Sequence, residues 1–403
     1  MGQSFSNLNW NCGIDCAKPR SLPLPNYIPV EILAQILLFL PVKSLIQLTP
    51  ICKSWYNLIK DPHFISAHLI HSLNIAKNNT NTSDDHRYLL ATPCKFKPFG
   101  DKYFCFVIHP DNMKVLEKWE LPICTRNMNV EVVNSCNGLL CLTECYPNAF
   151  GHVVYLWNMS IRKFKTVENS ELNLYNSIVF KRVTGFGYDY MANDYKVVRI
   201  LYFKEDVAPE IEVYSVKMGS WRRIGVDVDF IAHCSSASVP FVNGALHWMA
   251  QPYRLGKLGK YMFPVNEFIM AFDIADEGFR KMALPLNCSR LDASVMDFKE
   301  LLSLYVPFRS ADHIFEGCYI WVMSEYGVTK SWSKLFTINV SAPMRVRPLG
   351  LTKNEKLMLV KDEEQLVSLD LQNLQAQDLG LDACLYAVDC SYMESLALLD
   401  QGI

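Results

Sequence analysis

The chain has 403 residues, of which 50% are hydrophobic and 20% charged, and its formal net charge is −2 at pH 7. This composition is typical of globular proteins and leaves room for one large domain or two to three smaller ones. The near-neutral charge argues against a nucleic-acid or anionic-membrane partner, because either would require a basic surface field.

Residues 1–25 are polar, contain several prolines and glycines and show no periodicity, so we expect a disordered segment. The first six residues fit the M-G-x-x-x-[ST] pattern of N-myristoylation at Gly2, and Cys12 and Cys16 offer sites for a second acyl chain. A membrane tether through Gly2 is therefore one open hypothesis. We expect no secretory signal, because no basic region precedes an apolar core.

The cysteine pattern predicts thiols rather than disulfides or a metal site. The fourteen cysteines form no C-x-x-C pair, and no histidines stand at zinc-finger spacing. The longest uncharged apolar run, 32–42, is too short to cross a bilayer. We therefore expect a reducing compartment, the cytoplasm and/or the nucleus, and no membrane span.

Three short helices are predicted near the N-terminus. Apolar residues recur at helical spacing in residues 29–40 and again in 44–59, and a further helix is expected over 64–73. Pro41 ends the first helix, and Ser44 is a candidate cap for the second. A segment this small rarely buries so many apolar side chains alone. They must pack on the rest of the chain or be covered by another protein.

From residue 87 onward the sequence changes to short β-type runs separated by turn residues. Residues 77–86 are wholly polar and indicate a linker before this region. The expected division is 1–25 disordered, 26–75 helical domain, 76–86 linker and 87–403 β domain.

Aromatic and basic residues recur in the β region roughly 45 to 58 residues apart, a period typical of four-stranded propeller blades. We predict about six blades, possibly seven, with Asn-Gly hairpin turns at 137–138 and 243–244. A C-terminal strand at 384–388 or 395–399 would close the ring by pairing with an early strand. A β-sandwich pair or an irregular β array is the alternative. The chain has neither the Gly-Gly doublet of kelch repeats nor a Trp-Asp dipeptide.

Residues 28–64 resemble an F-box. The resemblance rests on the runs Ile28-Pro29-Val-Glu-Ile-Leu33, Leu40-Pro41-Val-Lys-Ser-Leu45 and Cys52-Lys-Ser-Trp55, followed by Leu58-Ile59, Pro62 and Phe64. Two departures stand out. Gln47-Leu-Thr49 replaces an Arg-Phe-Arg common in relatives, which removes two charges. Pro50 falls inside the expected second helix, where it would remove a backbone hydrogen bond, so it either marks a break between two short helices or weakens adaptor binding.

The β region resembles the F-box-associated domain of plant F-box proteins. The shared elements are Ser135-Cys-Asn-Gly-Leu139, Gly185-Phe-Gly-Tyr-Asp189, Asp194-Tyr-Lys-Val-Val198, Val242-Asn-Gly-Ala-Leu-His-Trp248 and Phe272-Asp273. The resemblance implies an α+β multidomain protein, in which a three-helix F-box precedes an all-β, kelch-like propeller.

The resemblance also implies a function, that of the substrate receptor of an SCF-type ubiquitin ligase. The F-box would dock on a Skp-type adaptor, and through it on a cullin and a RING protein, while the β domain binds an unknown target protein. The adaptor contacts implied by the resemblance are Pro29, Ile32, Leu33, Ile36, Leu37, Leu40, Pro41, Leu45, Cys52, Trp55, Leu58 and Ile59. Some of these must instead hold the helices together.

We find no motif that predicts catalysis. There is no P-loop, no G-x-S-x-G elbow and no H-E-x-x-H, and we expect no catalytic residue, cofactor or metal. We interpret His247 as a hydrogen-bonded structural residue and the glycines of Gly185-Phe-Gly187 as relieving crowding at a turn. The tryptophans Trp157, Trp221, Trp248 and Trp332 are interpreted as blade packing.

Two functional interpretations therefore stay open. In the first, the β domain recognises a target through loops, with candidate segments at 146–152, 202–210, 251–266 and 308–316. In the second, the protein is a propeller-fold enzyme or a carbohydrate-binding protein whose N-terminal helices pack on its own body.

Overall fold

The computed structural model describes residues 28–78, 87–93, 104–123, 129–145, 153–167, 170, 179–203, 207–233, 238–252, 267–285, 293–310, 315–339, 346–362, 365–382 and 386–399. The chain divides into two units, residues 1–81 with 399–403, and residues 82–398. Gly2, Cys12 and Cys16 lie outside the described residues, so lipidation stays a prediction.

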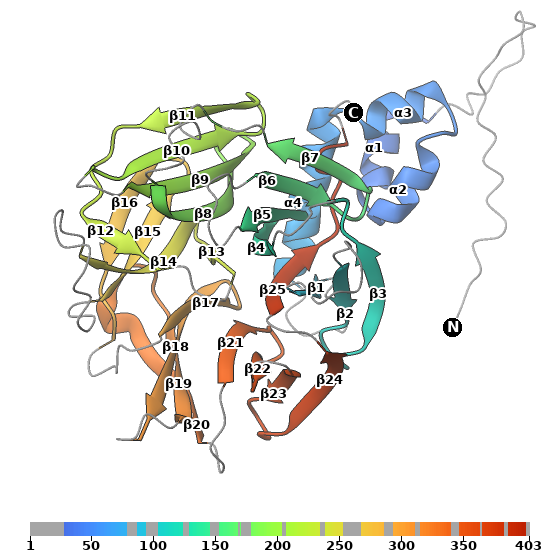
Figure 1. The fold of residues 1–403 in the computed structure, drawn as a ribbon. Helices are drawn as coiled ribbons and strands as arrows, with labels where there is room; N and C mark the ends of the chain where they lie inside the picture. The colour runs from blue at the N-terminus through green and yellow to red at the C-terminus, as the bar shows by residue number, and fades with distance from the viewer. Residues whose placement is uncertain are drawn as a thin grey trace, which may run out of the picture. The chain divides into compact units, whose positions relative to one another are not determined.

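The helical unit contains α1 (Val30–Leu38), α2 (Val42–Leu48), α3 (Lys53–Ile59) and α4 (Pro62–Asn78), drawn in blue in Figure 1. The expected fold class is confirmed, with four helices in place of three. The second expected helix is divided at Pro50, which lies between α2 and α3 and has no N–H to continue either helix.

Two details of the helix ends differ from expectation. Ser44 does not cap α2, because this helix begins at Val42 and Pro41 occupies its N-cap position. Helix α4 extends to Asn78, so residues 76–78 of the expected linker are helical and residues 79–86 lie outside the described residues. The backbone N–H of His63 donates to Asp61 Oδ1 at 2.7 Å, which caps the start of α4.

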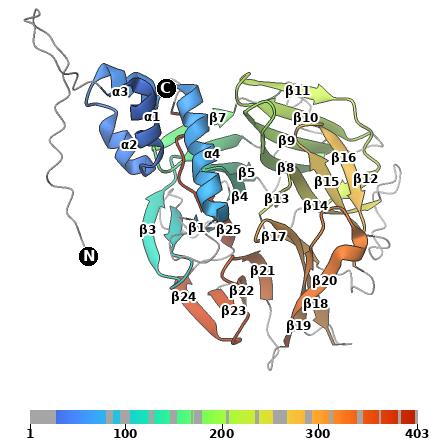
Figure 2. The same ribbon diagram turned by 180° about the vertical axis from the view of Figure 1, so that it is seen from behind.

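The second unit consists of six antiparallel sheets, which we number as blades 1 to 6 in ring order (Figures 1 and 2). Blade 1 contains β25 (Tyr386–Met393), β1 (Arg87–Pro93), β2 (Phe104–Ile108) and β3 (Val115–Glu120). Blade 2 contains β4 (Asn129–Cys136), β5 (Leu139–Cys145), β6 (Val154–Asn158) and β7 (Lys163–Val167). Blade 3 contains β8 (Val179–Asp189), β9 (Asp194–Phe203), β10 (Glu210–Ser215) and β11 (Ser220–Ile224).

The remaining blades follow the same order. Blade 4 contains β12 (Phe230–Ala232), β13 (Phe241–Val242), β14 (Ala245–Pro252), β15 (Phe268–Asp273) and β16 (Gly278–Met282). Blade 5 contains β17 (Ser294–Phe298), β18 (Leu301–Arg309), β19 (Phe315–Met323), the short 3-10 helix η2 (Thr329–Ser331) and β20 (Trp332–Asn339). Blade 6 contains β21 (Val346–Leu351), β22 (Lys356–Lys361), β23 (Gln365–Asp370) and β24 (Ala376–Asp382).

The ring is closed by its C-terminal strand. Strand β25 pairs with β1, and it also lies beside β4 of blade 2 and β21 of blade 6. Blade 1 is thus built from both ends of the β region, and β1 is hydrogen-bonded on both sides. The six-blade propeller and its closure are confirmed; the closing strand spans 386–393 rather than 384–388.

Residues 395–399, the other strand candidate, do not form a strand. Asn158 of blade 2, which is fully buried, donates through Nδ2 to the carbonyl oxygens of Ser395 at 3.0 Å and Ala397 at 2.8 Å. The side-chain amide takes the place of a neighbouring strand as hydrogen-bond donor. This C-terminal clasp, Ser395 to Ala397, fastens the end of blade 1 to blade 2.

Both predicted Asn-Gly turns are confirmed. Each joins two strands through two residues with positive φ, 49° and 81° at Asn137-Gly138 and 51° and 76° at Asn243-Gly244. The glycines of Gly185-Phe-Gly187, however, lie inside β8 and not at a turn. A Cβ added at Gly185 would approach atoms of Leu246 and Trp248 to 2.7 Å, so this glycine allows blade 4 to pack closely on blade 3.

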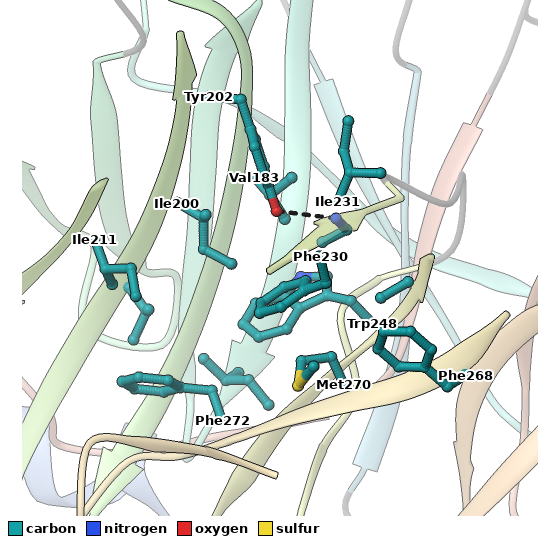
Figure 3. Packing of buried hydrophobic residues seen from close by; sticks show 14 of the residues in the cluster. Val183, Ile200, Tyr202, Ile211, Phe230, Ile231, Trp248, Phe268, Met270 and Phe272 are labelled. Atoms are coloured by element: carbon teal, nitrogen blue, oxygen red, sulfur yellow. Dashed lines mark hydrogen bonds between the residues drawn. The ribbon is translucent and has the colours of Figure 1, made fainter. Parts of the chain in front are cut away.

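The packing between blades 3 and 4 illustrates how the propeller is held together. Figure 3 shows Tyr202, Phe230, Trp248 and Phe272 gathered in one buried cluster drawn from both blades. The hydroxyl of Tyr202 accepts a hydrogen bond from the backbone N–H of Ala232 at 2.9 Å, so this buried polar atom is satisfied.

The clasp yields a stability prediction. Asn158→Ala leaves two buried carbonyls without their donor and is expected to lower the free energy of unfolding by about 2–3 kcal/mol. Urea unfolding of the full chain, followed by tryptophan fluorescence, measures this. The matched control is Asn112→Ala in the exposed β2–β3 turn, expected to cost less than about 1 kcal/mol. Equal losses in the two variants would show that the clasp does not stabilise the ring.

Candidate protein-interaction surface

The structure sorts the predicted adaptor contacts of the helical unit by exposure. Leu37, Leu45 and Ile59 are at most 1% exposed. The exposed members are Pro29, Ile32, Ile36 and Pro41, and the partly exposed members are Leu33, Leu40, Cys52, Trp55 and Leu58. Helical periodicity identified the apolar residues but could not separate these classes.

Further exposed apolar residues were missed by the sequence analysis. Phe39 and Ile51 are 72% and 57% exposed, and Val30 and Tyr56 are 43% exposed each. Ile51 falls within residues 44–59, which were expected to form one helix, but the break at Pro50 places it in the α2–α3 connection. Phe39 follows the last residue of α1, where helical spacing no longer applies. Pro50 was the sequence signal that could have shown that Ile51 lies outside a helix.

Exposed apolar residues are concentrated in this unit. Among the described residues, nine of the nineteen large hydrophobic side chains that are exposed lie between residues 28 and 75. The described part of the propeller, several times longer, contributes the other ten. A concentrated exposed apolar surface is typical of a protein-interaction site.

A buried histidine keeps the connection after α1 in place. His68 of α4 is 4% exposed, and its Nε2 lies 3.0 Å from the carbonyl oxygen of Leu40. Burial lowers the pKa of His68, so the ring is neutral near pH 7 and donates through Nε2–H. Phe39 packs edge-on against His71 of the same helix, with ring centroids 4.5 Å apart.

The break between α2 and α3 satisfies its own polar groups. Thr49 Oγ1 donates to the carbonyl oxygen of Leu45 at 3.0 Å, and the N–H of Ile51 donates to Leu48 O at 3.1 Å. Pro50 therefore costs this unit no interior hydrogen bond.

In the propeller, His247 is a hydrogen-bonded structural residue, as predicted. Its Nε2 lies 2.8 Å from the hydroxyl of Tyr326 in blade 5, and its backbone N–H donates to Pro240 O at 3.1 Å. Burial lowers the pKa of His247 to about 4, so the ring stays neutral at physiological pH.

The tryptophans named in the sequence analysis serve packing. Trp157, Trp248 and Trp332 belong to buried clusters between blades, and Trp221 lies under the guanidinium of Arg199 at 4.4 Å from the ring centroid. The part of the chain that the structure describes holds no group of three or more His, Cys, Asp or Glu residues arranged to bind a metal. None of its helices is long and apolar enough to cross a membrane.

Two buried ion-pair groups lie at blade 3. Arg199 and Glu212, each 1% exposed, are joined at 3.1 Å across β9 and β10. Lys196 donates to Asp189 Oδ2 at 2.7 Å and to Glu277 of blade 4 at 2.9 Å. Burial would raise the pKa of Asp189, but the hydrogen bonds from Lys196 and the Ala192 N–H outweigh it and lower that pKa. The first pair joins two strands of blade 3, and Lys196 joins blade 3 to blade 4.

The predicted recognition segments share a position in the topology. Each segment connects the second strand of its blade to the third strand. The connections run from β5 to β6, from β9 to β10, from β14 to β15 and from β18 to β19. Since strand directions alternate in every blade, the strand ends that flank these segments lie at one end of the propeller. Residues 146–152, 204–206, 253–266 and 311–314 themselves lie outside the described residues.

Comparison with known proteins agrees with this two-unit organisation. The family described as F-box associated beta propeller domain matches residues 104–400, and the F-box-like family matches residues 26–69. An F-box/kelch-repeat protein of Arabidopsis thaliana is 27% identical over 351 residues, covering 84% of this chain and 87% of the relative. The F-box protein CPR1 of the same plant is 27% identical over 388 residues, covering 89% and 85%.

The exposure classes predict different effects on folding. Leu45→Ala removes a fully buried side chain from the helical unit and is expected to destabilise it by about 2–5 kcal/mol. Ile32→Ala, at a site 47% exposed, should change the stability by no more than about 0.5 kcal/mol. Hydrogen exchange over residues 28–78 in the full chain measures both. Comparable losses of protection would contradict the assignment.

Proposed function

The chain belongs to the F-box-associated β-propeller family, and from this premise we propose that it is the substrate-recognition subunit of an SCF-type ubiquitin ligase. In this role the helical unit docks on a Skp-type adaptor, and through it on a cullin and a RING protein. The propeller binds a target protein in the cytoplasm or nucleus. The protein itself carries out no chemical step.

The observation that carries this proposal is the exposed apolar surface of the helical unit, in the segment that matches the F-box-like family. We assign adaptor contact to the exposed and partly exposed members of the predicted set, Pro29, Ile32, Leu33, Ile36, Leu40, Pro41, Cys52, Trp55 and Leu58. Val30, Phe39, Ile51 and Tyr56 extend the same surface. Docking of apolar helical side chains into a partner's groove is a recurrent mode of recognition.

The buried residues receive a different role. We propose that Leu37, Leu45 and Ile59 act as the core that holds the helices in a docking-competent arrangement, because their side chains are inaccessible to a partner. An aspartate at Leu37 would unfold the unit instead of testing its contact with the adaptor.

The two departures from the F-box pattern have different weights in this proposal. Pro50 lies in the break between α2 and α3, so it leaves the helices intact. Gln47 and Thr49 stand where relatives often carry arginines, which removes two positive charges from the docking region. The loss reduces electrostatic steering of the adaptor and slows association more than it weakens the apolar contacts.

Positioning is the only catalytic contribution required of such a receptor. Holding a target lysine near a ubiquitin-charged enzyme raises the effective concentration of the two reacting groups and lowers the entropic barrier to transfer. In this proposal the propeller holds the target, and the apolar docking unit attaches it to the ligase.

Adaptor co-purification tests the proposal. Ile32→Asp with Ile36→Asp places two charges on the exposed face of α1, and we expect adaptor binding to fall by at least about a hundredfold, because each charge would be buried without a partner. The matched control is Leu335→Asp on β20 of the propeller, which is 46% exposed and should leave adaptor binding unchanged. Undiminished binding by the double variant, with its hydrogen exchange intact, would refute the docking assignment.

A further inference from the structure

The helical unit is basic, although the chain as a whole carries a net negative charge. Residues 28–78 contain four lysines against one glutamate and one aspartate, whereas the formal net charge of the chain is −2. The aspartate, Asp61, is engaged at the start of α4, where its Oδ1 accepts from the backbone N–H of His63. Positive charge therefore predominates on the unit whose exposed apolar surface we assign to the adaptor.

Two of these lysines stand where a helix disfavours a cation. Lys43 is the second residue of α2, and Lys53 is the first residue of α3. The first turn of a helix bears the positive end of the helix dipole, so a cation there destabilises the helix. Neither helix has an acidic residue in its first turn or a side-chain hydrogen bond at its N-cap to offset this effect.

The rest of the unit follows the dipole preference. Glu31 lies in the first turn of α1, and Asp61 caps α4. Lys60 occupies the C-cap of α3, the favourable end for a cation, and its Nζ donates to the hydroxyl of Tyr56 at 2.7 Å. Lys43 and Lys53 thus break a local rule that their neighbours obey, and such departures mark candidate functional positions.

Neither lysine is stabilised by a carboxylate within the described part of the chain. Both side chains are exposed, and no Asp or Glu of the described residues lies within ion-pair distance of either Nζ. Unpaired cations also occur on strands of the propeller, but a sheet has only a small net dipole and imposes no comparable penalty on their sign. The unfavourable helix position distinguishes Lys43 and Lys53 from those cations.

Both lysines adjoin the proposed docking surface. Lys43 follows the exposed Pro41 by two residues, and Lys53 follows Ile51, which is 57% exposed, by two residues. Lys53 also shares the exposed face of α3 with Tyr56, which stands three residues further on and is 43% exposed. A charged group beside exposed apolar side chains suits the polar rim of a protein interface.

We propose that Lys43 and Lys53 contact carboxylate groups on the rim of the adaptor's apolar groove. The inference rests on the proposed function, because it specifies the chemistry of the surface that the helical unit meets. In the complex, an adaptor carboxylate beside each ammonium group offsets the unfavourable helix position. It also adds complementary charge to the apolar contacts, which speeds association and fixes their register.

Solubility is the ordinary explanation of charged residues beside an exposed apolar surface. It requires charge but not a positive sign: a glutamate at either position would keep the unit soluble and would also stabilise its helix. Solubility therefore leaves the lysine at both helix starts unexplained, whereas a partner that bears carboxylates accounts for it.

Charge reversal tests the proposal, because it should move folding and binding in opposite directions. In the full chain with Lys43→Glu and Lys53→Glu, hydrogen-exchange protection of α2 and α3 should rise by about two- to fivefold, since the helix starts become favourable. Affinity for a purified Skp-type adaptor, measured by biolayer interferometry, should instead fall by at least about tenfold at about 0.05 M NaCl. The loss should shrink at about 0.5 M NaCl, where the charges are screened.

The matched control is Lys330→Glu with Lys334→Glu. Both lysines are exposed in blade 5, so the net charge changes equally while the helical unit is untouched, and adaptor affinity should change by less than about threefold. Binding of the unmodified chain to the same sensor reports the proposed function separately.

The proposal is overturned if the helical-unit variant binds the adaptor as tightly as the unmodified chain or no more weakly than the control. It is equally overturned if protection of α2 and α3 falls together with affinity, because the lysines would then stabilise the fold. Retained adaptor binding with loss of binding to phosphatidylserine vesicles would assign the lysines to a membrane surface instead.

Discussion

A helical segment of this size cannot bury all the apolar side chains that its helices require, and the functional organisation of the chain follows from that limit. The unit places Leu37, Leu45 and Ile59 inside and leaves Ile32, Ile36, Phe39 and Ile51 largely outside. The inner set contributes one buried side chain from each of α1, α2 and α3, and His68 of α4 fixes the connection after α1. The outer set remains in contact with water unless another protein covers it, which is why we interpret the unit as a docking module.

The propeller is subject to a different constraint. An open row of sheets would leave strand edges unpaired at its two ends, so the first and last blades must join. Strand β25 provides the joint by pairing with β1, and Asn158 then fastens the residues after it to blade 2. The buried pair Arg199–Glu212 and the group around Lys196 add polar links at blade 3. A closed ring can devote its loops to recognition, since its stability depends on the strands beneath them.

The sequence predicted best those features that depend only on residues adjacent in the chain. Asn137-Gly138 and Asn243-Gly244 specify tight turns through positive φ, and both turns occur. The helical spacing of Ile32, Leu33, Ile36 and Leu37 identified α1 but not which side chains face inward, because that depends on how four helices pack. Pro50 left a break between two short helices as one open interpretation, and the structure shows that break with Ile51 in it.

The central claim, that the outer apolar residues of the helical unit are exposed in the chain and covered by an adaptor, can be measured directly by hydroxyl-radical footprinting. The full chain would be labelled alone and with a purified Skp-type adaptor. The account predicts that Ile32, Ile36, Phe39 and Ile51 react in the chain alone and become protected in the complex. The exposed Met191 and Met218 of blade 3 should react equally in both samples. Protection of the four helical-unit residues before the adaptor is added, or no change on its addition, would contradict the account.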